Sequence, residues 1–176
     1  MRLPTSLVVI GLLPALPAMA LDLPARRAGL WEIQIQGVGN LPAMTAQHCI
    51  DAKTDREMNA LGSGMAQQQC SQQDVQQSGG TMTVDSVCKI GSGTMITHAV
   101  ITGDFNKAYT VRVTSKRDGG DNTKSAANGT LTIEAKWLGA CRPDQRPGDI
   151  VMGGRTMNIL DLKKGAGGQR PPGARP

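Results

Sequence analysis

The stretch CSQQDVQQSGGTMTVDSVC, from Cys70 to Cys88, decides the predicted fold of this chain. Its midpoint falls on Gly79-Gly80, a dipeptide that readily supplies the positive φ angles of a hairpin tip. Flanking strands of about eight residues would place Cys70 opposite Cys88 at the base of that hairpin. The spacing therefore predicts a β-hairpin closed by a disulfide.

The N-terminus has the organisation of a secretory signal peptide. Arg2 precedes an apolar run over residues 7–16, and the small-x-small sequence AMA follows at residues 18–20. The apolar run is too short to remain as a membrane-spanning helix. We expect cleavage after Ala20 and a mature protein that is periplasmic or secreted.

The cysteines are best interpreted in that exported context. Four cysteines allow three pairings, and an even number in an exported chain is typical of a disulfide framework. Pairing Cys70 with Cys88 leaves Cys49 with Cys141, and each closed loop stabilises the fold by roughly 3–4.5 kcal/mol. A zinc site or a redox pair is disfavoured because no C-x-x-C motif occurs.

Alternating apolar and polar residues predict short antiparallel strands along most of the chain. In GLWEIQIQG, from Gly29 to Gly37, the apolar side chains recur with period two. Similar runs lie at residues 44–50, 81–85, 94–102, 109–114 and 130–137. A helix is predicted from Asp51 to Gly62, with residues 62–69 as a loop.

These elements predict a mainly β fold. We expect an antiparallel meander that forms a curved sheet or open barrel, with one short helix, two disulfides and a disordered C-terminal tail. The predicted organisation is a signal peptide over 1–20, a leader over 21–28, a β-domain over 29–141 and a Pro/Gly-rich basic extension over 142–176, largely disordered. Whether residues 150–163 form an ordered element is left open.

The apolar side chains of the predicted strands lie on one face of the predicted sheet. This apolar face is the candidate ligand-binding surface. Its members are Trp31, Ile33, Ile35, Val111, Val113, Leu131, Ile133 and Trp137. The same face could equally be a packed core.

Several features together resemble a known family of exported bacterial proteins. They include GLWE at Gly29 to Glu32, the paired Cys70 and Cys88, GDFNKAYTVRV from residue 103 and KWLGAC ending at Cys141. In order and spacing the chain resembles the DUF3617 family, whose function is unassigned. The resemblance covers residues 29–141 and implies export and a cysteine-framed β-fold, but it brings no catalytic residues.

No catalytic, cofactor or metal site is predicted. The two histidines, His48 and His98, fall inside predicted strands, and no common catalytic motif is present. The seven methionines outside the signal peptide are scattered in sequence, without an M-x-x-M or H-x-M cluster, so they are interpreted as core fillers rather than copper ligands.

Two functional hypotheses from different classes remain. The first is a non-enzymatic binding module for a small apolar or amphipathic ligand, and the second is a structural or interaction protein of the cell envelope. The formal charge of +5 does not indicate nucleic-acid binding in an exported chain, because four aromatic residues make no stacking surface. We expect at most weak membrane contact through the basic tail.

Overall fold

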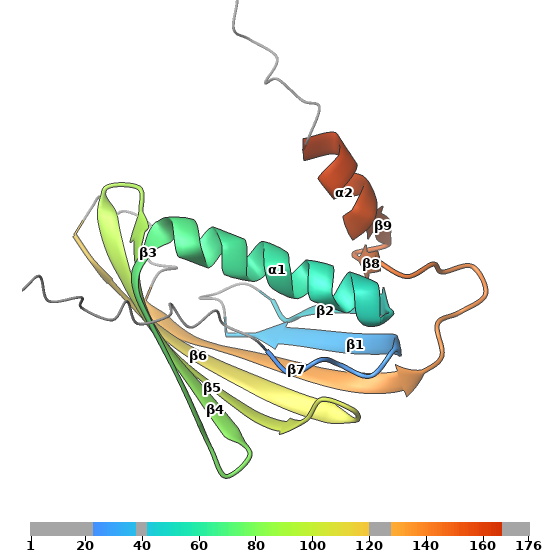
Figure 1. Cartoon of the computed structure of the whole chain (residues 1–176), viewed down its shortest axis with the longest axis horizontal. Helices are drawn as coiled ribbons and strands as arrows, with labels where there is room; N and C mark the ends of the chain where they lie inside the picture. The colour runs from blue at the N-terminus through green and yellow to red at the C-terminus, as the bar shows by residue number, and fades with distance from the viewer. Residues whose placement is uncertain (1–22, 38–41, 120–127, 167–176) are drawn as a thin grey trace, which may run out of the picture.

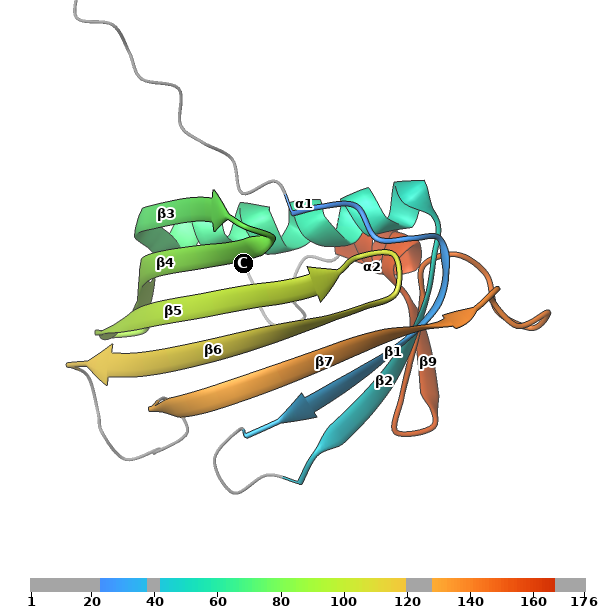
Figure 2. The same cartoon turned by 90° about the horizontal axis from the view of Figure 1, so that it is seen from below.

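A computed structural model describes residues 23–37, 42–119 and 128–166. The chain forms one open antiparallel sheet of nine strands in the order β3-β4-β5-β6-β7-β1-β2-β8-β9, which is curved in Figure 1 and in the orthogonal view of Figure 2. The strands are β1 (Gly29–Gln36), β2 (Met44–Ile50), β3 (Cys70–Ser78), β4 (Thr81–Ile90), β5 (Gly93–Asp104), β6 (Ala108–Asp118), β7 (Gly129–Gly139), β8 (Asp149–Met152) and β9 (Arg155–Asn158). The prediction of a mainly β fold with a curved antiparallel sheet is confirmed.

The stapled hairpin forms as its spacing predicts. Strands β3 and β4 meet at Gly79-Gly80, whose φ angles are +56° and +80°, and Cys70 lies directly opposite Cys88 in the strand register. Both disulfides, Cys70 to Cys88 and Cys49 to Cys141, are those that the sequence predicts.

The first helix, α1 (Ala52–Gln69), is longer than predicted. The expectation of a helix ending at Gly62 and a loop over 62–69 is wrong. A helical glycine costs only about 1 kcal/mol relative to alanine, and most residues after Gly64 are good helix formers. The helix ends only where Cys70 begins β3.

Helix α1 links the edge strand β3 to β2, the third strand from the other edge of the curved sheet. These two strands are six positions apart in the strand order, and Figure 2 shows the helix on the inner side of the curve. Its 18 residues span about 27 Å.

The inner face of the sheet carries the core in two clusters. Trp31, Ile33, Ala46, Ile50 and Ala135 are buried at the β1, β2 and β7 side. A second cluster of Met82, Val84 and Ile101 lies between β4 and β5. Because the register alternates, polar side chains such as Glu32 and Lys136 lie on the outer face.

The sheet continues beyond Cys141. Residues 142–176, expected to be a largely disordered extension, contain β8, β9 and a second helix, α2 (Ile159–Ala166). Strand β8 pairs with β2 and β9 with β8, so the element left open at residues 150–163 is a hairpin followed by a helix. The predicted signal peptide and the basic tail from residue 167 lie outside the described residues.

Candidate functional site: a cavity beneath the leader

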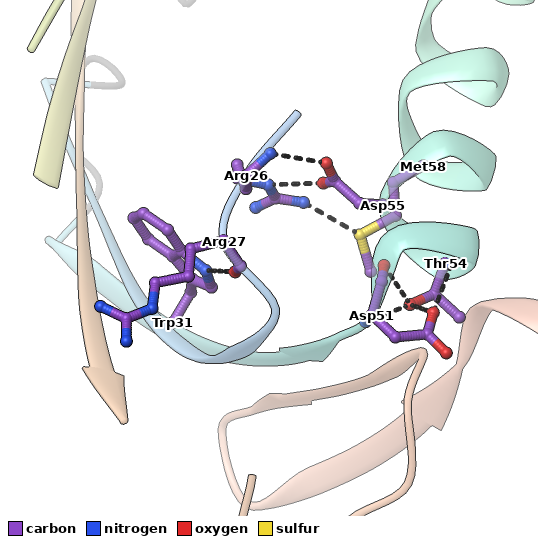
Figure 3. A network of polar contacts seen from close by, with 7 residues as sticks. All are labelled: Arg26, Arg27, Trp31, Asp51, Thr54, Asp55 and Met58. Atoms are coloured by element: carbon purple, nitrogen blue, oxygen red, sulfur yellow. Dashed lines mark hydrogen bonds and ion pairs between the residues drawn. The ribbon is translucent and has the colours of Figure 1, made fainter. Parts of the chain in front are cut away.

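The first turn of α1 is fixed by a reciprocal capping box. Asp51 Oδ1 accepts a hydrogen bond from the Thr54 amide at 2.8 Å, and Thr54 Oγ1 accepts one from the Asp51 amide at 2.9 Å (Figure 3). Hydrogen bonds from Thr54 hold the pKa of the Asp51 carboxyl below its ordinary value. This turn positions the next residue, Asp55, on the side of the helix that meets the leader.

Asp55 holds the leader through Arg26. Its two carboxylate oxygens accept hydrogen bonds from the Arg26 amide at 2.8 Å and from Arg26 Nε at 2.7 Å (Figure 3). Arg26 also donates to the thioether sulfur of Met58 at 3.4 Å. The side chains of Arg26 and Asp55 are only 10% and 1% exposed, so this ion pair is buried.

The leader is fastened to the sheet as well as to the helix. The indole nitrogens of Trp31 and Trp137 donate to the carbonyl oxygens of Arg27 and Ala28 at 2.8 and 3.1 Å. The Arg27 amide donates to the Phe105 carbonyl oxygen at 3.0 Å. The Arg27 guanidinium lies 3.7 Å from the centre of the Trp137 ring, in a cation–π contact.

A cavity of about 180 Å³ lies between the leader, α1 and the inner face of the sheet; we call it the leader cavity. Its lining comes from the leader, the helix and two strands with their connecting turn: Leu23, Pro24, Arg26, Asn59, Ile101, Phe105, Tyr109 and Val111. Most of these side chains are apolar, with Arg26 and Asn59 as polar exceptions. The cavity is therefore chemically suited to a small molecule that is apolar over most of its surface.

Aromatic rings form one wall of the leader cavity. Phe105 and Tyr109 stack with ring centres 4.6 Å apart, and Tyr109 lies 5.6 Å from Trp31. Burial raises the pKa of the Tyr109 hydroxyl, and the neighbouring Arg26 opposes that rise. The hydroxyl is therefore neutral at physiological pH.

The structure places the eight predicted ligand-facing residues on one face, as the strand registers require. Trp31 and Ile33 are buried in the first core cluster, and Ile35, Ile133 and Trp137 pack against it. Val111 lines the leader cavity. Val113 and Leu131 are half-buried on the same face, opposite each other in register.

Sequence reasoning missed the part of the site contributed by the leader and the helix. Arg26 and Asp55 are 29 residues apart, and no periodic pattern connects them. Two charged features were visible: an Arg-Arg pair directly before the first strand and an aspartate in the first turn of the predicted helix. Neither feature alone identifies its partner.

Other polar features lie away from the leader cavity. A hollow of about 490 Å³, lined mainly by polar side chains, lies over β3, β4 and β5. At that end of the sheet, His98 Nδ1 lies 2.7 Å from Asp85 Oδ1, with both side chains about half exposed. His48 and His98 lie on opposite faces of the sheet, four positions apart in the strand order, and so form no acid–base pair.

Among the described residues, no group of three or more His, Cys, Asp or Glu side chains is placed to hold a metal ion. Within the described ranges, neither helix is both long and apolar enough to span a bilayer.

The fold and the cavity define a class of protein: a disulfide-framed antiparallel β-protein whose curved sheet is bridged by a helix and fastened to its own leader. The family model described as "Protein of unknown function (DUF3617)" matches residues 26–141, and the chain belongs to this family. The resemblance is thus confirmed, and the match runs from Arg26 of the buried ion pair to Cys141 of the second disulfide. No curated protein and no solved structure matches the chain.

Proposed function

We propose that the protein is exported to the periplasm or beyond and acts there as a non-enzymatic binding module. Its ligand is a small apolar or amphipathic molecule held in the leader cavity. The signal-like sequence of residues 1–20 supports export. The two disulfides support it as well, because such bonds persist in oxidising compartments.

The single observation that carries the binding proposal is the mainly apolar lining of the leader cavity. Its volume of about 180 Å³ is comparable to an engineered apolar cavity of about 150 Å³ that holds benzene. Arg26 and Asn59 offer hydrogen-bond donors beside that apolar lining, which suits a ligand with one polar end.

Native mass spectrometry of protein isolated from its own cell envelope tests this proposal. We expect a small non-covalent mass on the wild-type protein and its loss in Val111→Phe, because the larger ring fills the cavity. Val113→Phe is the matched control, since Val113 lies two residues along the same face of β6 and does not line the cavity. Retention of the mass in Val111→Phe would place the ligand elsewhere.

The alternative function, a structural or interaction protein of the cell envelope, is favoured by a different observation. Much of the inner face is filled by its own side chains, with Trp31 fully buried and Ile33 only 6% exposed. In the same experiment, a bare wild-type mass together with a co-purifying protein partner would support this alternative and contradict the binding module.

A further inference from the structure

The polar end of the leader cavity carries a charge that the protein itself balances. Arg26 lines the cavity, and its side chain is only 10% exposed. Its counter-charge is Asp55, which is 1% exposed and accepts hydrogen bonds from the Arg26 amide and from Arg26 Nε. Figure 3 shows this carboxylate on the α1 side of the guanidinium. The two charges therefore form a neutral pair at the edge of the cavity.

The other described residues that line the cavity add no charge at neutral pH. Asn59 carries an uncharged amide, and burial raises the pKa of the Tyr109 hydroxyl and keeps it protonated. Burying a charge without a partner is costly. A carboxylate in the cavity would bring an unbalanced negative charge close to Asp55, and an ammonium group would lie against Arg26. The charge balance of the cavity therefore favours an uncharged ligand.

The hydrogen-bonding groups at this end of the cavity are mainly donors. A guanidinium has several N–H donors and no acceptor. Arg26 uses Nε for Asp55, and its Nη2 donates to Met58 Sδ at 3.4 Å, although a thioether sulfur is only a weak acceptor. The hydroxyl of Tyr109 is close enough for the charge of Arg26 to lower its pKa against the larger effect of burial, and it too can donate. A ligand atom placed here must therefore accept hydrogen bonds, as a carbonyl oxygen does.

The wall of the cavity suits a flat apolar body. The rings of Phe105 and Tyr109 are stacked, with 13° between their planes, and aromatic faces of this kind pack well against another ring. Ile101 and Val111 complete the apolar lining on the strands. The volume of about 180 Å³ is in the range of an apolar cavity that holds benzene. The cavity therefore suits a single ring with a short substituent.

We propose that the leader cavity selects an uncharged molecule with a flat apolar body and a carbonyl oxygen at one end, and rejects carboxylates of the same shape. This inference rests on the proposed binding function and specifies its class of ligand. It gives the buried ion pair a second role besides holding the leader: Arg26 donates to the carbonyl oxygen, and Asp55 makes a second negative charge unfavourable.

Three probes of nearly equal shape test this selection on the full mature chain at neutral pH. Acetophenone carries the carbonyl oxygen, α-methylstyrene has a CH2 group in place of that oxygen, and benzoate has a carboxylate in place of the methyl ketone. Affinities are measured by NMR titration, followed at the ring of Tyr109 and the methyl groups of Ile101. We expect acetophenone to bind at least about tenfold more tightly than benzoate and several-fold more tightly than α-methylstyrene.

A substitution of the counter-charge should change the selectivity in a predictable direction. Asp55→Asn keeps the shape and one acceptor oxygen but leaves the charge of Arg26 unbalanced. The affinity for benzoate relative to acetophenone should therefore rise at least about tenfold. Asp85→Asn, in the exposed pair with His98, is the matched control and should leave the selectivity unchanged. Circular dichroism checks that Asp55→Asn is folded, and the ranking of the three probes on the wild type decides the proposal independently of this variant.

Val111→Phe separates the failure of this inference from the failure of the proposed function. If benzoate binds the wild type as tightly as acetophenone does, and both are lost in Val111→Phe, the cavity binds ligands but the proposed selection is wrong. If none of the three probes binds the wild type, or if Val111→Phe leaves their binding unchanged, the binding function of the cavity is contradicted together with this inference.

Discussion

The buried ion pair between the leader and α1 offers the sharpest test of the fold. Asp55→Ala removes the carboxylate that accepts two hydrogen bonds from Arg26, at 2.7 and 2.8 Å. Hydrogen bonds to charged groups contribute about 1.5–3 kcal/mol each, and breaking one side of a buried ion pair costs about 3–5 kcal/mol. We therefore expect the free energy of unfolding to fall by about 4 kcal/mol.

A matched control is available on the surface of the same protein. Asp85→Ala also removes a carboxylate 2.7 Å from a basic side chain, but Asp85 and His98 are 54% and 52% exposed. Exposed ion pairs contribute about 0–1 kcal/mol. Urea denaturation of both variants, with the disulfides intact, should therefore separate them by about 3 kcal/mol. Equal losses would refute the idea that burial makes the leader contact important.

Two further measurements identify the cause of the loss. Hydrogen exchange should speed up at the amides of Arg26 and Arg27 in Asp55→Ala, because the first loses its acceptor and the second pairs with Phe105 only while the leader is docked. Adding Arg26→Met to Asp55→Ala removes the stranded charge and should recover part of the stability.

Three more changes have expected outcomes. Replacing Cys70 and Cys88 with serine should lower the free energy of unfolding by about 3 kcal/mol, measured by urea denaturation, because the closed loop spans 18 residues. The contribution of His48 to the free energy of unfolding should be complete above pH 6.5 and fall by up to about 3 kcal/mol as the pH drops to about 4, because burial lowers the pKa of His48 in the folded protein and the unfolded chain therefore binds the proton first. Urea denaturation at a series of pH values should show this fall in the wild type and its absence in His48→Gln. Gly103→Ala should lower the free energy of unfolding by about 2 kcal/mol, since φ at this position is +115° and the new Cβ would lie 2.5 Å from the Ala108 carbonyl oxygen. Gly62→Ala should instead raise the melting temperature, because the new methyl group has open space around it and alanine favours the helix.

The strands and crosslinks could be predicted because their signals are local. Period two fixes which side chains share a face, and a central Gly-Gly dipeptide fixes which cysteines meet. The same signal was present at Gly153-Gly154, whose φ angles are +57° and +74°, and it forms the turn between β8 and β9. The sequence DIVMGGRTMN therefore predicts the hairpin of β8 and β9, although it does not predict that β8 pairs with β2.

The end of α1 and the contacts of the leader could not be predicted, for two different reasons. The helix continues through Gly62 and Gly64 because a penalty of about 1 kcal/mol for each glycine does not outweigh good helix formers and a fixed end at Cys70. The leader docks through single contacts between segments far apart in sequence, such as Arg26 with Asp55. Sequence periodicity carries no information about such contacts, so the cavity that they enclose emerges only from the fold.

The positions of the two disulfides explain how a polar helix stays over the sheet. Helix α1 has few apolar residues with which to hold itself down, yet Cys49 lies two residues before its N-cap, Asp51, and Cys70 follows directly after its last residue. Each end of the helix is therefore next to a covalent bond, and Asp55 adds the buried ion pair near its start. Because α1 and the leader both line the leader cavity, the crosslinks that hold the helix also help to keep one side of the cavity in place.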